Sequence, residues 1–387
     1  MKLNKNRIID FIYYVEQNIG SRIAGSKEEK LIARYIKSIL SHNSDKTDIE
    51  SFFCNSRSSQ HEFNTISIIY LLGIIAYINY PPSTLFFIFL YIIYIIFDKF
   101  YAIKIIDFIY SKSKSHNLIS VIKPFKEIKN TIIFTSHLDS PYINKLYESK
   151  YKDYLSAFNL IFPILFFLLF IVTLIKINHW ADILIDYLYL MPFLAIGLVI
   201  YLQNKFVTYE KSFGANNGLS GVAINLELAN HFFIERTNNT QIIIANFGAK
   251  EANLSGSKYF LNKNLDILKE AYIINIDSVA GGILHILESE KNIKHNNEVI
   301  KIIIDIAKEQ NINLECAKSE VVTTDASTFS YEKFKSVSFL SFDKYGIPLR
   351  YCLKEDLPQY MFEEDLQNVF KICVKFVEYI DEREKRT

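Results

Sequence analysis

The chain has 387 residues, of which 50% are hydrophobic, and its 43 basic side chains are balanced by 42 acidic ones. A formal net charge of +1 argues against a general nucleic-acid binder, because such proteins carry a basic excess. The high apolar content argues against a disordered chain, and four cysteines without regular spacing argue against a disulfide scaffold or a zinc-finger module.

The N-terminal region predicts two helices, over residues 8–18 and 27–40, rather than a signal peptide. Its first residues, MKLNKNRIIDFIYYVEQ, lack the continuous apolar core and the cleavage site that a signal peptide needs. The scattered thiols are typical of a protein kept in a reducing compartment.

Two long apolar segments follow the pattern of membrane hairpins. Residues 63–97 carry no charged side chain and are divided by the turn Tyr80-Pro-Pro-Ser83. A second apolar block runs from Leu155 to Leu202, divided by a polar turn at 176–182 and carrying one further acid, Asp186. A span needs about 20 apolar residues, so we expect four spans in two transmembrane hairpins, over 63–100 and 154–203. The first two spans are short, and a re-entrant hairpin is the alternative there.

The flanking charges predict which side of the membrane the rest of the chain occupies. The turns within the hairpins carry a single basic residue, Lys176, whereas the outer flanks carry Lys99, Lys104, Lys112, Lys114, Lys150, Lys152, Lys205 and Lys211. The positive-inside rule therefore predicts a multi-pass integral membrane protein with a cytoplasmic globular domain. His179 and Trp180 are expected to anchor the second hairpin at the interface, with the lipid bilayer as a partner.

The remaining residues, 1–62, 101–153 and 204–387, alternate β-branched runs with helical patterns. This alternation predicts an α/β fold, a three-layer sandwich around a largely parallel mixed sheet. Strands are expected over 118–122, 131–136, 241–247, 271–277, 283–287 and 337–342, and further helices over 220–235, 253–262, 296–309 and 363–380.

Polar motifs stand at the ends of the expected strands, where α/β sheets gather functional groups. These motifs are His137-Leu-Asp139, the loop from Gly214 to Val222, the pair Lys250-Glu251, and Asp277. Taken singly, each also fits an ordinary turn or the start of a helix.

Three further motifs, added to these four, form an ordered set along the chain. They are Gly20-Ser-Arg-Ile-Ala-Gly-Ser26, Thr324-Asp325-Ala-Ser-Thr-Phe329, and Tyr351-Cys-Leu-Lys-Glu-Asp-Leu-Pro358. In this order, the motifs resemble those of the di-zinc aminopeptidases of the MH clan, metallopeptidase family twenty-eight. The resemblance covers nearly all of the sequence outside the apolar segments.

The resemblance implies a role for each matched position. In the family, the positions of His137 and Asp277 help to hold one zinc ion, and those of Glu251 and Cys352 help to hold the other. The position of Asn217 carries an aspartate that bridges the two ions. Lys250 stands where the family has its general base, and Asp139 is expected to orient His137.

Three of these positions depart from the family. An amide at Asn217 cannot bridge two cations, the ammonium of Lys250 has no lone pair, and Cys352 replaces a histidine. The family's carboxylates sum to about −4, whereas here Glu251, Asp277 and Lys250 sum to about −1 when ionised. We therefore expect Lys250 to pair with Glu251 or Asp277 in place of the metals, with no zinc or at most one.

These departures favour a catalytically inactive pseudopeptidase that binds or scaffolds a peptide or another membrane protein, and no nucleic acid. One alternative is a hydrolase with a single zinc on His137, Asn217, Asp277 and Cys352, and with Lys250 as a base of lowered pKa. A channel or transporter is the other alternative, for which Asp186 is the only intramembrane acid.

Overall fold

The computed structural model describes residues 5–100, 107, 109–152, 155–178 and 190–383. The chain forms two compact units. The α/β unit contains residues 1–56, 112–143 and 211–387, and the apolar helical unit contains residues 57–111 and 144–210. The expected boundaries at 62, 100, 153 and 203 differ from these by several residues, because the polar flanks of the apolar segments are grouped with the helices.

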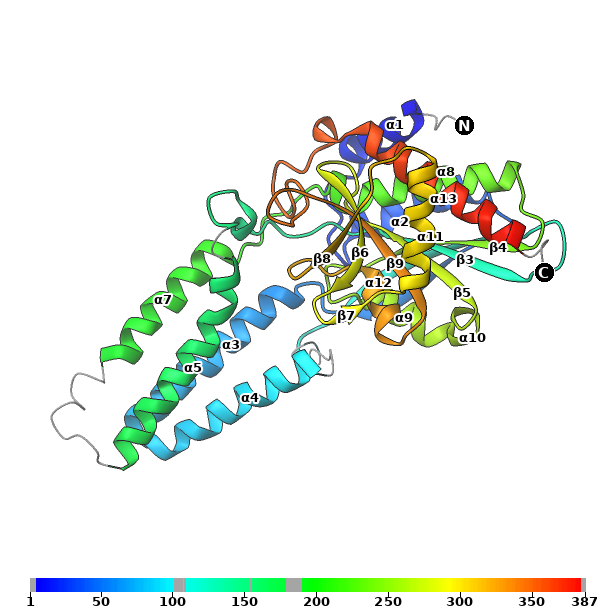
Figure 1. Cartoon of the computed structure of the whole chain (residues 1–387). Coiled ribbons are helices and arrows are strands. Elements are labelled where there is room, and N and C mark those ends of the chain that lie inside the picture. The colour runs from blue at the N-terminus through cyan, green and yellow to red at the C-terminus, as the bar shows by residue number, and fades with distance from the viewer. Residues whose placement is uncertain (1–4, 101–106, 108, 153–154, 179–189, 384–387) are drawn as a thin grey trace. The chain divides into compact units, whose positions relative to one another are not determined.

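A mixed sheet forms the centre of the α/β unit (Figure 1). Its strand order is β1-β2-β4-β3-β5-β9-β6-β7, with β8 beside β6. The strands β4, β3, β5 and β9 are parallel to one another, and β1 and β2 are antiparallel to their neighbours. On the other side of the sheet, β6 is antiparallel to β9 and β7 but parallel to β8. The strands are β1 Lys46–Cys54, β2 Ser113–Ile122, β3 Asn130–His137, β4 Thr240–Phe247, β5 Ala271–Ile276, β6 Ile283–Glu290, β7 Ile293–Lys294, β8 Glu315–Ser319 and β9 Lys335–Phe342.

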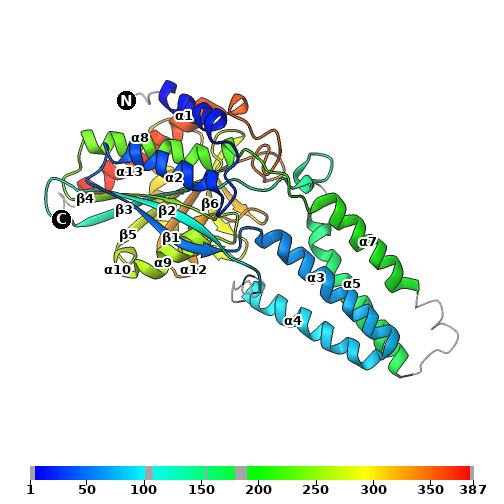
Figure 2. The same ribbon diagram turned by 180° about the vertical axis from the view of Figure 1, so that it is seen from behind.

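Helices cover both faces of this sheet and complete three layers (Figures 1 and 2). Alternate side chains of β4 point to opposite faces, so that Ile242 and Ile244 join one apolar core and Ile243 and Ala245 join another. The first core includes side chains of α1 Lys5–Asn18, α2 Lys27–Leu40, α8 Ser220–Ile234, α11 Asn297–Glu309 and α13 Glu363–Arg383. The second includes side chains of α9 Ser255–Lys263, α10 Leu265–Leu268 and α12 Asp325–Tyr331.

The α/β class and the mixed sheet are confirmed, and each expected strand and helix of the α/β unit is present within a few residues. The expected parallel pairing holds for the four central strands and for β6 with β8, and the other pairs are antiparallel. The sequence analysis missed β1, β7 and β8, and it missed α10 and α12. β1 and β8 contain many exposed polar residues because they lie at the borders of the sheet, and β7 has only two residues. Their sequences therefore lack the continuous apolar run of a buried strand.

Both apolar segments are inserted where two stretches of the α/β unit lie side by side. The first begins after Cys54 and returns at Ser113, and these two residues are paired across β1 and β2. The second begins beyond Tyr142 and returns at Lys211, and these two residues form an isolated β-bridge. Because each insertion starts and ends on paired residues, it leaves the sheet undisturbed.

The apolar helical unit consists of α3 Ser58–Asn79, α4 Thr84–Phe100, α5 Leu155–Ile177 and α7 Leu190–Phe206, with the short helices η1 Pro81–Ser83 and η3 Lys145–Tyr147. Side chains from all four long helices form its core, among them Tyr70, Tyr91, Phe166 and Val199. Within the described residues, Ser58–Asn79 and Leu160–Ile177 are long and apolar enough to cross a membrane, and Pro81–Phe97 and Leu194–Phe206 are shorter apolar helices. The residues expected in the second turn, His179 and Trp180, and the acid Asp186 lie outside the described residues.

Close packing between α8 and β5 gives a test of the α/β unit. A Cβ atom at Gly221 would lie 2.0 Å from the carbonyl oxygen of Ile276. We therefore expect Gly221→Ala to destabilise the protein by about 3 kcal/mol or more, because the backbone would have to move. Thermal unfolding of the purified protein measures this. Gly197→Ala on α7, where nothing lies within 4 Å, is the control. Equal melting temperatures for the two variants would contradict the packing.

Candidate functional site

The motif at the end of β3 holds two backbone loops together. Asp139 is fully buried, and its two carboxylate oxygens accept the backbone N–H groups of Lys250 and Glu251 at 3.0 and 2.9 Å. Nδ1 of His137 lies 3.0 Å from the backbone oxygen of Asp139 and 3.3 Å from its carboxylate. The carboxylate expected to orient His137 therefore also fixes the loop that carries Lys250.

His137 is surrounded by oxygen atoms on both sides of its ring. Its Nε2 atom lies 3.4 Å from Oδ1 of Asp277, which stands directly after β5. Burial alone would lower the pKa of His137, but the negative charge of Asp277 and the hydrogen bonds with Asp139 and Asp277 outweigh burial and raise this pKa to about 10. With an acceptor facing each nitrogen, the ring favours its doubly protonated form. Such an imidazolium has no lone pair for a metal.

Lys250 lies between two carboxylates. Its Nζ atom donates a hydrogen bond of 2.9 Å to Oε1 of Glu251, and it lies 3.2 Å from Oδ2 of Asp277 in an ion pair. The hydroxyl oxygen of Tyr351 is 3.5 Å away. Burial lowers the pKa of Lys250, but Asp277 and Glu251 outweigh it and raise this pKa well above its ordinary value. The ion pair predicted from the sequence is therefore present, and it joins Lys250 to both candidate acids.

The same contacts keep Asp277 ionised. Burial would raise the pKa of this carboxyl, but Lys250 and His137 lower it below its ordinary value. Asp277 thus balances two cations at once, with the side-chain hydroxyl of Ser278 as a further donor at 2.7 Å.

Asn217 and Cys352 complete the set of expected site positions. Gly218, at φ +100°, lets the loop pass so close to His137 that a Cβ atom there would lie 2.9 Å from the backbone oxygen of His137. Nδ2 of Asn217 donates to Glu251 at 3.2 Å and lies 4.0 Å from the sulfur of Cys352. Burial, with the charge of Glu251, raises the pKa of Cys352 well above its ordinary value, so the group is a neutral thiol. The structure therefore brings together all seven residues proposed from the sequence.

Comparisons with known proteins concern the fold and part of the sequence. Residues 201–377, less than half of the chain, match the sequence model of Peptidase family M28. This part of the chain resembles peptidase family M28. No curated protein sequence gives a significant match to the chain.

Solved structures extend the likeness to the whole M28 fold. A Zn-dependent exopeptidase from Parabacteroides distasonis superimposes with a TM-score of 0.60 at 14% identity, covering 97% of this chain and 98% of that one. A leucine aminopeptidase precursor from Bacteroides thetaiotaomicron gives a TM-score of 0.60 at 15% identity and covers 97% of each chain. A glutaminyl cyclase from the same species, bound to N-acetylhistamine, gives 0.60 at 15% identity over 97% of this chain and 98% of its own. At these identities the likeness concerns the fold alone.

The M28 relatives imply zinc, and the residues present here do not fit a pair of zinc ions. Two cations, Lys250 and the doubly protonated His137, already face the available carboxylates. Asn217 is a neutral amide, and Cys352 is a neutral thiol. Within the part of the chain that the structure describes, no three His, Cys, Asp or Glu side chains converge as a metal-binding group. One feature favours a bound metal ion: Oδ1 of Asn217 is buried and accepts no hydrogen bond among the described residues.

The sequence analysis missed three buried ionisable residues that hold together the seven site residues, which we call the M28 site. Arg22 donates to the backbone oxygens of Leu138 at 2.9 Å, Phe213 at 2.9 Å and Gly214 at 3.0 Å. Glu29 accepts the backbone N–H groups of Gly25 and Ala249 at 2.8 and 3.1 Å, and the hydroxyl of Ser115 at 2.7 Å. Arg22 lies inside a recognised motif, which was the available signal, whereas Glu29 resembles any polar residue at the start of a helix.

The third missed residue, Asp356, fixes the backbone of the loop from Gly214 to Val222. Its carboxylate accepts the backbone N–H groups of Asn216 at 2.7 Å and Asn217 at 3.1 Å. Burial raises the pKa of Asp356 to about 6. Asp325, the acid of the motif Thr324–Phe329, is buried at the first position of α12, and burial raises its pKa to about 7.

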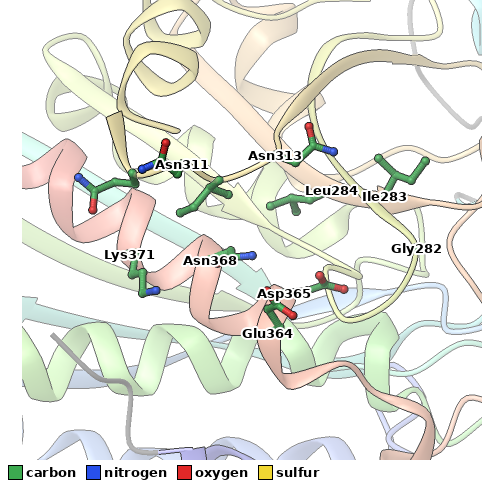
Figure 3. Close-up of a pocket in the computed structure, with 11 residues that line it drawn as sticks. Gly282, Ile283, Leu284, Asn311, Asn313, Glu364, Asp365, Asn368 and Lys371 are labelled. Atoms are coloured by element: carbon green, nitrogen blue, oxygen red, sulfur yellow. The ribbon is translucent and has the colours of Figure 1, made fainter. Parts of the chain in front are cut away.

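A polar pocket of about 490 Å³ lies elsewhere on the α/β unit (Figure 3). It is lined by the start of β6, the loop after α11 and the first turns of α13, including Asn313, Glu364, Asp365 and Lys371. None of the M28 site residues lines it. The partly buried Asp365 has a pKa raised to about 6 by burial and by Glu364. Of the other charged lining groups, Glu364 is exposed and Lys371 is half-buried.

The protonation of His137 predicts a dependence of stability on pH. A raised pKa in the folded protein stabilises it fully below the ordinary value, 6.5, and this stabilisation is lost as the pH rises through about 10. The pKa of Glu29, raised to about 8, also makes stability fall as the pH rises, but over a lower pH range. We therefore expect the melting temperature to fall between pH 8 and 10, and to fall less in His137→Gln. Equal slopes in thermal unfolding of the two proteins would contradict an imidazolium at this position.

Proposed function

We propose that this chain is a membrane-embedded pseudopeptidase of the M28 type, whose α/β unit binds or scaffolds a peptide or another membrane protein. The observation that carries the proposal is the position of the Lys250 ammonium, 2.9 Å from Glu251 and 3.2 Å from Asp277. These two carboxylates are the acids that a metal would need, and the lysine neutralises them from within the chain.

The chemistry of hydrolysis supports inactivity. Losing a general base costs about 10²- to 10⁴-fold in rate, and Lys250 is a poor base because its pKa is raised rather than lowered. Without a metal there is also no activated water to act as the nucleophile. Both losses fall on the same residue, since Lys250 replaces the base and pairs with the metal-binding acids.

A single zinc ion is the competing account. It is favoured by Oδ1 of Asn217, a buried oxygen without a hydrogen bond in the described part of the chain. It is opposed by the neutral thiol of Cys352 and by the imidazolium of His137, since both would have to lose a proton first. We therefore place the single-zinc hydrolase second.

The outer surface of the apolar helices supports the membrane part of the proposal. Large apolar side chains are exposed on all four helices, including Ile75 at 55%, Phe89 at 57%, Phe167 at 62% and Leu194 at 75%. Helices that are apolar on their outer as well as their inner faces are typical of membrane spans. The excess of lysine at the outer flanks favours a cytoplasmic α/β unit.

Zinc content tests the pseudopeptidase. We expect the wild-type protein, equilibrated with zinc and dialysed, to keep less than one ion per chain, because its carboxylates are already neutralised. The triple variant Asn217→Asp, Lys250→Glu, Cys352→His restores a formal charge of about −4 and should keep about two ions. Elemental analysis measures both, and release of amino acids from peptides measures activity in parallel.

The controls for this experiment separate the two accounts. Glu251→Gln in the triple variant removes one ligand and should reduce its zinc content. A wild-type protein that holds one zinc per chain, loses it in Asp277→Ala and releases amino acids would establish the single-metal hydrolase instead.

A native cysteine tests the orientation. Cys316 is exposed, whereas Cys54, Cys352 and Cys373 are buried. We expect a membrane-impermeant thiol reagent to label Cys316 only after cells that express the protein are permeabilised. Tyr80→Cys, in the exposed turn of the first hairpin, should be labelled in intact cells. Labelling of Cys316 in intact cells would place the α/β unit on the outer side.

A further inference from the structure

Both inserted segments join the α/β unit at the same edge of its sheet. Strands β3 and β4 are parallel, and β2 runs antiparallel to β4, so the start of β2 and the end of β1 lie at the carboxyl edge of β3 and β4. The paired residues Cys54 and Ser113 mark this place for the first segment. The bridge between Tyr142 and Lys211, just beyond the end of β3, marks it for the second. Covalent continuity therefore ties this edge to the apolar helices.

The loop of residues 343–362 follows β9 and lies at the same carboxyl edge, because β9 is parallel to β5 and β3. Its aromatic side chains Tyr360 and Phe362 are 42% and 54% exposed. The guanidinium of Arg350 lies 4.3 Å from the ring centre of Tyr360. Phe362 and Leu349 both approach Gly281, where a Cβ atom would lie 3.3 and 3.4 Å from them. We call these four side chains, Leu349, Arg350, Tyr360 and Phe362, the loop surface.

The loop surface has the chemistry of a membrane interface. Tyrosine is enriched at the headgroup level of bilayers, where its ring meets the acyl chains and its hydroxyl meets water. Arginine can bury its stem in the same layer and place its charge among phosphates. The exposed and half-buried charges of residues 343–364 show no basic excess, with Lys344, Arg350 and Lys354 opposed by Asp343, Glu355, Glu363 and Glu364. Attraction therefore depends on the aromatic rings and not on anionic lipid.

Exposure alone does not identify a docking surface. Phe125 in the loop between β2 and β3 is 72% exposed, more than Phe362. The backbone of that loop is fixed, since the N–H of Phe125 donates to Thr237 at 3.0 Å. The loop precedes β3, and Figure 1 shows it, in cyan, at the end of the α/β unit opposite to the orange loop that contains Tyr360. The two loops thus differ in the edge of the sheet at which they lie, and only the loop surface lies at the edge where both inserted segments begin and end.

We propose that the loop surface docks on the headgroup region of the bilayer that holds the apolar helices. The inference rests on the membrane part of the proposed function. The loop also carries Tyr351, which contacts Lys250, Cys352, which contacts the side chain of Asn217, and Asp356, which accepts the backbone N–H of Asn217. Docking therefore brings the lipid surface next to the substituted M28 site, so the peptide that this site receives is one presented at the membrane surface.

Fluorescence quenching by brominated lipid tests the proposal on the full-length protein. The single tryptophan, Trp180, is replaced by phenylalanine. Phe362→Trp, Phe125→Trp and Phe167→Trp are then made separately in this background, and each protein is reconstituted into zwitterionic vesicles. We expect lipid brominated near the headgroup to reduce the fluorescence of Trp at 362 and leave that at 125 unchanged. Phe167 is 62% exposed on α5, so Trp at 167 should be quenched by lipid brominated deeper in the acyl chain.

The three positions separate the possible failures. Quenching at 167 with identical behaviour at 362 and 125 overturns the docking and leaves the membrane spans in place. Absence of quenching at 167 overturns the membrane part of the proposed function and the docking with it. If Trp at 362 is quenched in anionic vesicles but not in zwitterionic vesicles, the loop binds lipid through charge, and binding through the aromatic rings is overturned.

Discussion

The ion pair network of Lys250 is the interaction on which the site depends. The buried Asp277 follows β5 and the half-buried Glu251 follows β4, on either side of β3 in the sheet, and carboxylates removed from water destabilise a fold unless a positive charge compensates them. A metal ion would supply that charge from solution. Here the chain supplies it covalently, and the protonated His137 adds a second cation. The electrostatic requirement of the site is met before any ligand arrives.

This arrangement explains how the surrounding loops keep their shape. Asp139, Glu29 and Asp356 each accept two backbone N–H groups, and Arg22 donates to four backbone oxygens. These buried side chains fix the loops through hydrogen bonds that involve no side chain of a metal position, although some of them go to the backbone of Asn217, Lys250 and Glu251. A substitution at a metal position can therefore change the chemistry and leave the M28 fold intact.

The sequence predicted those features that depend on residues close together in the chain or on positions matched to known motifs. The strands of the buried centre are visible as β-branched runs, and the pairing of Lys250 followed from counting charges at matched positions. The protonation of His137 could not be predicted, because it depends on an acceptor facing each nitrogen, and those acceptors come from different strands. For the same reason the buried roles of Glu29 and Arg22 were missed, since their partners are distant in sequence. β1 and β8 were missed because strands at the borders of a sheet need no apolar pattern.

The ends of both apolar insertions, the substituted site and the loop 343–362 all lie at the carboxyl edge of the sheet. Each insertion starts and ends on paired residues at the carboxyl edge, so the sheet tolerates it without a change of register. The carboxyl edge is also where α/β sheets place their binding sites. The loop 343–362 contributes Cys352 to the interior of that edge and Tyr360 to its exterior. A peptide that approaches this edge would meet the interior through a neutral thiol, an amide and a fixed ammonium, groups that can hold a chain end by hydrogen bonds but cannot cleave it.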